Sequence, residues 1–182
     1  MTMSDRICLM NAGEIAQLGT PDDLYFRPSS VFVADFLGES NLLDATVLER
    51  AGDQVRVAMP GVEGAQGASA MVYDPMVEPG RAVKLLLRPQ NLHIHDGAVG
   101  GDGAHRDGVA TISAKLTDIM VTGGMTKLYL QSSVMGGAVG EGGGVGKSLV
   151  ASFPTHRRGK RFEIGQTLGL AWRADDAVAI AG

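Results

Sequence analysis

The sequence predicts a mainly β protein, in which a small barrel or sandwich follows a short segment made of a hairpin and two helices. The run Gly80–His95, GRAVKLLLRPQNLHIH, has the clearest pattern of a buried strand in the chain. From Asn41 onward, short apolar runs are separated by Gly and Pro, which indicates about eight short strands. Helix signals are confined to the residues before Asn41. We therefore expect one unit over residues 1–40 and a β domain over residues 41–182.

The first predicted element is a hairpin over residues 5–18. Ile7–Met10 is expected to pair with Glu14–Leu18 across Asn11-Ala12-Gly13, because Asn and Gly tolerate the positive φ that a tight turn needs. The only cysteine, Cys8, lies between Ile7 and Leu9 in this apolar run. It has no partner for a disulfide, so we expect a buried, unreactive thiol in a reducing compartment.

Two short helices are predicted after the hairpin. Thr20 suits the N-cap of the first and Pro21 its first position, and the helix should end at Arg27-Pro28. The second should begin near Ser29 or Ser30 and end at Gly38. Its apolar residues are too numerous for one stripe facing the core. Such a surface is seldom left in water, so we expect it to fold back on the barrel or to pack against a second copy of the chain.

The strands of the β domain follow from alternating apolar residues. In the central strand, Val83, Leu85 and Leu87 share one face, and Pro89 ends it. Because nearly all of this strand is apolar, we expect both of its faces to be covered. The other predicted strands are Leu43–Leu48, Gln54–Met59, Ala70–Tyr73, Asn91–His95, Val109–Val121 (one long strand or two), Lys127–Gln131, Leu149–Phe153, Leu168–Trp172 and Val178–Ile180. The glycine-rich stretches Gly97–Gly108 and Gly136–Gly146 are predicted loops.

The net charge and the hydropathy of the chain indicate which partners and which location in the cell to expect. The 16 Lys and Arg residues against 20 Asp and Glu residues give a net charge of −4, which disfavours nucleic acid and anionic membranes as partners. No window approaches the length of a membrane span, and the N-terminus lacks the apolar stretch of a signal peptide. We therefore expect a cytoplasmic protein.

Two short motifs suggest ligand sites that the spacing does not support. Gly142–Ser148, GGGVGKS, resembles a phosphate-binding loop, but Glu141 occupies the position where that motif requires Gly. His93, His95 and Asp96, with the distant His105, could ligate a metal, although a glycine-rich loop orients a ligand poorly. We expect no cofactor and no metal in this chain, and a small anion or metal site in the loops remains an alternative.

The run His156–Arg161 is the most basic stretch in the chain. On a barrel it could bind single-stranded nucleic acid, which usually also needs stacking aromatic residues. Aromatic residues make up only 5% of the chain, so we favour a solvated loop or a contact with a partner subunit. Single-strand binding is kept as a second alternative. We find no Ser/His/Asp or Cys/His arrangement that would indicate nucleophilic catalysis.

The residues up to Leu43 resemble the end of the nucleotide-binding domain in ATPase subunits of ABC importers. The resemblance lies in MSDRICLMNAGEIAQLGTPDDLYFRPSSVFVADFLGESNLL, with its G-T-P helix and its F-V-A-x-F-(I/L)-G-x-x-N exit. The remainder is similar to the accessory TOBE domain, through Leu87-Arg88-Pro89 with Leu92, Gly165 before Leu168–Trp172, and Asp175–Val178. Gly124-Met125-Thr126 is most similar to the spermidine/putrescine transporter branch.

This resemblance implies an oligomer-binding (OB)-type barrel attached to an ATPase whose two copies drive a membrane permease. In the family, the phosphate loop, signature motif, catalytic carboxylate and switch histidine precede the segment that matches Met3, so we expect a non-enzymatic carboxy-terminal part. A longer parent would use ATP and Mg²⁺ at the inner face of the membrane. The implied function is accessory or regulatory, with homodimer contacts and ligand sensing. The expected interaction residues are Phe32, Phe36, Leu37, Arg88 and Met125.

Overall fold

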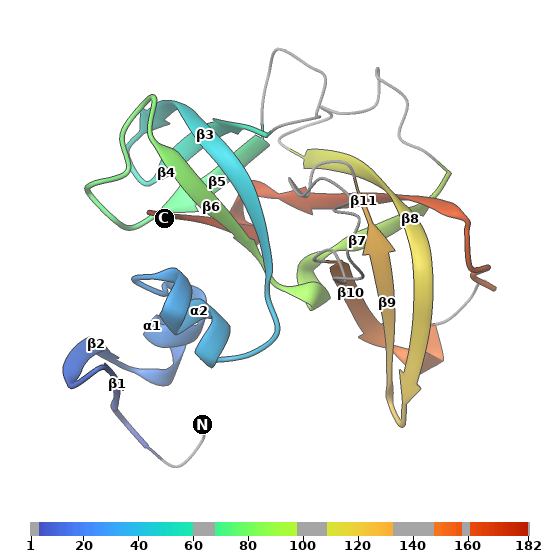
Figure 1. Ribbon diagram of the computed structural model, residues 1–182, viewed down its shortest axis with the longest axis horizontal. Helices are drawn as coiled ribbons and strands as arrows, with labels where there is room; N and C mark the ends of the chain where they lie inside the picture. Colours follow the sequence, from blue (N-terminus) through green and yellow to red (C-terminus); the bar gives the residue numbers. More distant parts are fainter. Residues whose placement is uncertain (1–3, 60–67, 98–108, 133–147, 158–160, 182) are drawn as a thin grey trace.

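The strands after residue 40 form two β structures, a closed barrel and a separate five-stranded sheet (Figure 1). The computed structural model describes residues 4–59, 68–97, 109–132, 148–157 and 161–181. The fold is mainly β, as predicted. The glycine-rich stretches after Gly97 and around Gly136–Gly146, the Gly142–Lys147 part of GGGVGKS, and His105 lie outside the described residues.

The N-terminal segment contains the predicted hairpin and two helices. β1 (Ile7–Asn11) pairs antiparallel with β2 (Glu14–Gly19), followed by α1 (Pro21–Phe26) and α2 (Val31–Phe36). Thr20 caps α1 in a reciprocal capping box with Asp23, and this hydrogen bond lowers the pKa of the Asp23 carboxyl. Ser30 caps α2 by accepting from the Val33 amide. Local sequence thus explains where both helices begin.

The closed barrel has the strand order β12-β5-β4-β3-β6. Its parallel pair, β12 with β5, brings the end of the chain back to the barrel. β6 is the predicted central strand and pairs with β3 on one side and β12 on the other. The strands are β3 (Asn41–Ala51), β4 (Gln54–Ala58), β5 (Ala68–Val72), β6 (Ala82–Leu87) and β12 (Ala177–Ala181).

The second sheet has the order β10-β9-β8-β11-β7, all antiparallel. The Val109–Val121 pattern forms one strand, β8 (Val109–Thr122), which shifts register between Leu116 and Asp118. The turn Gly123-Gly124 leads into β9, as predicted, and Gly123 has a φ of 53°. The remaining strands are β7 (His93–Asp96), β9 (Met125–Gln131), β10 (Leu149–Pro154) and β11 (Thr167–Arg173); the short helix η1 (Pro89–Asn91) joins β6 to β7.

One hydrophobic core extends through both β structures. It contains barrel residues such as Leu43 and Val57 together with Leu116, Leu130 and Trp172 of the second sheet. Trp172 is fully buried, and the described residues offer no hydrogen-bond partner to its Nε1. The boundary at residue 41, which would separate the N-terminal segment from the β domain, stays a prediction.

The expectation that Cys8 is buried was wrong, because the structure places it on the exposed side of β1. Side chains alternate along a strand, so Leu9 faces the small cluster with Leu24 and Val33, while Cys8 and Met10 face outward. Only one face of this two-stranded hairpin is covered by the helices, so the residues on its other face are exposed.

Within the residues that the structure describes, no helix has both the length and the apolar character needed to cross a membrane.

Candidate functional site: the junction held by Arg88

Arg88 joins the N-terminal helices to the barrel. It directly follows β6, and its Nη1 donates to the carbonyl oxygens of Ala34 at 3.1 Å and Gly38 at 3.3 Å, and also to Ser40 Oγ. Its Nη2 donates to the carbonyl of Tyr25 at 3.1 Å. One side chain therefore satisfies backbone acceptors at the C-terminal ends of both α1 and α2.

The electrostatics of this contact favour a cation. The last carbonyls of a helix carry partial negative charge, so a guanidinium placed there is stabilised by both helices. Arg88 is only 5% exposed, and its guanidinium carbon lies 4.3 Å from the centroid of the Tyr25 ring. Burial lowers the pKa of Arg88, while Tyr25 and Asp35 act in the opposite direction. Arginine nevertheless stays protonated in proteins, so the junction holds a buried positive charge.

Apolar packing and an ion pair reinforce the junction. Ala34 of α2 is buried against Leu86 of β6 and Ile180 of β12. Beyond α2, Glu39 accepts a hydrogen bond from Lys127 Nζ of β9 at 2.6 Å, which raises the pKa of Lys127. The N-terminal segment therefore packs on the β domain, but this packing leaves the phenylalanines of its apolar surface exposed.

Asn41 connects the barrel to the second sheet. Its side-chain Nδ2 donates to the carbonyl of Val150 at 2.8 Å, and its Oδ1 accepts from the Val150 amide at 2.7 Å. Val150 belongs to β10, an edge strand, and Asn41 is 3% exposed. The carboxamide of Asn41 thus supplies both hydrogen bonds that a neighbouring strand would otherwise supply.

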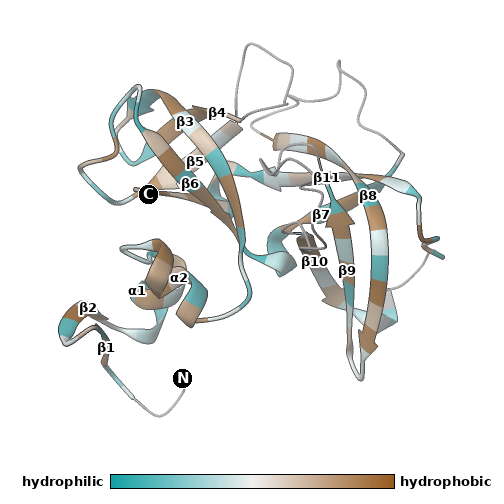
Figure 2. Cartoon of the chain, in the orientation of Figure 1, coloured by the Kyte–Doolittle hydropathy of each residue, from teal (hydrophilic) through white to brown (hydrophobic). Residues whose placement is uncertain are grey.

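The predicted interaction residues do not gather at one place. The Phe32 and Phe36 rings lie 6.2 Å apart on α2 and are 37% and 65% exposed. Leu37 is half-buried against the Leu9 cluster. Arg88 lies at the junction, whereas Met125, 37% exposed, lines a cavity of the second sheet. Figure 2 shows hydrophobic residues on both helices.

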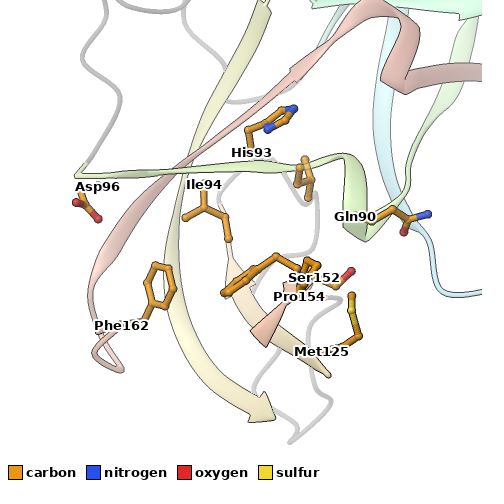
Figure 3. A pocket seen from close by; sticks show the side chains of 10 residues that line it. Gln90, His93, Ile94, Asp96, Met125, Ser152, Pro154 and Phe162 are labelled. Carbon is orange, nitrogen blue, oxygen red and sulfur yellow. The ribbon is translucent and has the colours of Figure 1, made fainter. Parts of the chain in front are cut away.

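That cavity has a volume of about 590 Å³ and lies between the two edge strands of the second sheet, β7 and β10 (Figure 3). Its apolar lining comes from Leu92, Ile94, Met125, Phe153, Pro154 and Phe162. A second cavity of about 390 Å³ lies where Arg27 and Pro28 meet Tyr73, Pro75 and β12. Sequence reasoning found neither cavity, because each combines segments distant in the chain.

The other sites that the sequence suggested gain no support from the described residues. Those residues include no group of three or more His, Cys, Asp or Glu side chains able to hold a metal. His93 and His95 are exposed, as expected for a strand near the sheet edge. Residues 158–160 of the basic run lie outside the described part of the chain, as does all of GGGVGKS except Ser148.

The sequence analysis did not predict that four further residues form contacts at this junction: Tyr25, Ser40, Asn41 and Gln90. Gln90 Nε2 donates to the Tyr25 hydroxyl at 2.6 Å, close to where Arg88 stacks on the same ring. Asn41 is the last residue of the F-V-A-x-F-(I/L)-G-x-x-N motif, but the motif does not indicate that its side chain bonds to Val150 of β10. Arg88 itself was expected from the family motif, and its position between an apolar strand and a proline is a second signal for it.

Known proteins resemble this chain over most of its length. The TOBE domain model matches residues 85–180, more than half of the chain. A spermidine/putrescine import ATP-binding protein PotA of Haemophilus ducreyi is 46% identical over 96 residues, which is 53% of this chain and 25% of that protein. PotA 2 of Pseudomonas aeruginosa is 33% identical over 178 residues, 96% of this chain and 43% of that protein. The chain thus spans less than half the length of these relatives.

A solved structure supports the fold alone. The cytoplasmic molybdate-binding protein ModG, with molybdate bound, has a TM-score of 0.55 and 10% sequence identity, covering 78% of this chain and 96% of that one. This likeness agrees with the predicted OB-type β architecture. The match to the TOBE domain model, over more than half of the chain, shows that the chain belongs to the TOBE domain family.

Proposed function

We propose that this chain is a non-catalytic accessory domain of the ATP-binding subunit of an ABC importer for polyamines. The observation that carries the proposal is the similarity over 96% of the chain to a spermidine/putrescine import ATP-binding protein. In the complete subunit, ATP and Mg²⁺ would bind outside this chain, and a membrane permease would be the partner at the cytoplasmic face. Within the chain, the Arg88 junction would hold the helical segment at a fixed angle to the β domain. The β domain would sense a ligand.

Uptake and ATPase assays test this proposal. The complete ATP-binding subunit, expressed with its permease in cells lacking polyamine uptake, should restore accumulation of labelled spermidine or putrescine. The present chain alone should hydrolyse ATP no faster than buffer, because we assign it no nucleotide site. ATP turnover by the purified chain, or uptake that never includes a polyamine, would contradict the proposal.

We further propose that the exposed phenylalanines form a subunit contact. Phe26, Phe32 and Phe36 are 58%, 37% and 65% exposed on the two helices. Exposed aromatic clusters of this kind commonly mark protein interfaces. A second copy of the chain is the partner we propose in solution, since a closed dimer buries the same patch on both subunits.

Light scattering provides the measurement for this contact. The chain should be a dimer at micromolar concentration, and the double substitution Phe32→Ser with Phe36→Ser should raise its dimer dissociation constant at least tenfold. Met76→Ser removes a side chain that is 62% exposed on the barrel and serves as the matched control. A strict monomer, or a dimer unaffected by the double substitution, would refute a contact through this face.

A further inference from the structure

Ser152 lines the cavity between β7 and β10, and its main chain has an unused hydrogen-bonding position. In an antiparallel strand, the N–H and C=O of one residue point to the same side, and this side alternates along the chain. Val150 directs both groups away from β9, to Asn41. Ser152, two residues further along β10, therefore also directs its main-chain donor and acceptor away from β9, and no described residue bonds to them.

The rest of the β10 edge is closed to an added strand. The Asn41 carboxamide already bonds to the main-chain N–H and C=O of Val150, and Pro154 has no N–H to donate. Strand addition needs several successive free positions, whereas here only Ser152 offers both a donor and an acceptor. A single planar amide fits this position better than an extended peptide, and Asn41 already shows that geometry at Val150.

The side chains that line the cavity beside Ser152 favour a ligand with a flat, apolar ring. The Phe153 and Phe162 rings lie 5.9 Å apart and line the cavity with Ile94, Met125 and Pro154. Figure 3 shows Ile94 and Phe162 directed into the same space that Ser152 and Met125 border, with Asp96 at one end. The described lining includes no Lys or Arg that would balance the charge of an anionic ligand. The volume of about 590 Å³ suits a small molecule.

We propose that this cavity binds an uncharged aromatic or heteroaromatic amide, whose donor and acceptor pair with the Ser152 main chain while its ring packs on Phe153 and Phe162. The inference gives the ligand-sensing part of the proposed function a site and a ligand class. Gln90, at the cavity margin, bonds to the Tyr25 hydroxyl of α1, so a bound ligand adjoins the Arg88 junction.

Calorimetry on the purified chain tests the site with benzamide, benzoate and benzylamine, which share a ring and differ in charge and hydrogen-bonding groups. Benzamide should bind at least tenfold more tightly than benzoate or benzylamine. Ser152→Pro removes the edge N–H together with the hydroxyl and should weaken benzamide binding at least tenfold. Ser152→Ala removes the hydroxyl but keeps the main chain, and its affinity should stay within threefold of the unsubstituted chain.

A second pair of variants covers the case in which Ser152→Pro fails to fold. Ser152→Trp should fill the cavity and abolish binding, while Thr167→Trp, on an exposed position of β11, should leave it unchanged. Absence of heat with millimolar benzamide would overturn the inference. So would equal binding of benzoate, insensitivity to Ser152→Trp, or tighter binding of an acetylated, amidated Val-Thr-Val-Thr peptide. These outcomes are independent of the uptake assay, so a failed site leaves the proposed function standing.

Discussion

Arg88→Ala is expected to lower the free energy of unfolding by about 3 kcal/mol, because it removes several charge-assisted hydrogen bonds at once. The carbonyls of Tyr25, Ala34 and Gly38 would lose their donor, and the Tyr25 ring would lose the guanidinium that stacks on it. Urea denaturation followed by circular dichroism measures the change. Hydrogen exchange should show the largest loss of protection in α1 and α2.

Two further substitutions separate charge from geometry at this position. Arg88→Lys keeps the charge but cannot reach carbonyls of both helices with a planar fork, so it should recover less than half of the lost stability. Arg81→Ala is the matched control, since Arg81 is exposed and donates to a single carbonyl, that of Met76. If Arg88→Ala were as stable as Arg81→Ala, the junction would not depend on the buried guanidinium.

The elements of this fold were predictable because their signals are local. The Asn11-Ala12-Gly13 turn, the Thr20 cap and the alternation in β6 each depend on residues a few positions apart, and the structure confirms all three. The exposure of Cys8 was not predicted, since an apolar run does not show which face of a hairpin is covered. The separation of the strands into a closed barrel and a second sheet was also missed, because strand partners are chosen by tertiary packing.

The candidate site could be predicted only in part. Arg88 was identified from its resemblance to a family motif, but its partners Ala34 and Tyr25 precede it by 54 and 63 residues. Backbone carbonyls are present at every position, so no sequence pattern indicates which of them a buried arginine will bind. The exposed Phe32 and Phe36 were predictable as a surface because α2 carries more apolar residues than one face can bury.

Asn41→Ala is expected to lower the free energy of unfolding by about 3 kcal/mol, because it leaves a buried donor and a buried acceptor of Val150 without partners. Asn41→Asp keeps an acceptor for the Val150 amide but places a carboxylate against its carbonyl, so it should be at least as destabilising. Asn91→Ala makes the same chemical change at a half-buried position where the side chain has no hydrogen bond to any described residue, and should cost less than about 1 kcal/mol.

The consequence of Asn41→Ala should extend beyond stability. With Val150 uncovered, β10 presents free backbone groups at Val150 and Ser152, which are successive positions on the same side of the strand. The edge should then accept an extended peptide, so the Val-Thr-Val-Thr peptide should bind Asn41→Ala more tightly than the unsubstituted chain. Equal peptide binding by both forms would mean that Asn41 does not protect this edge. Tighter binding would show that one carboxamide determines whether the cavity admits a strand or only a small amide.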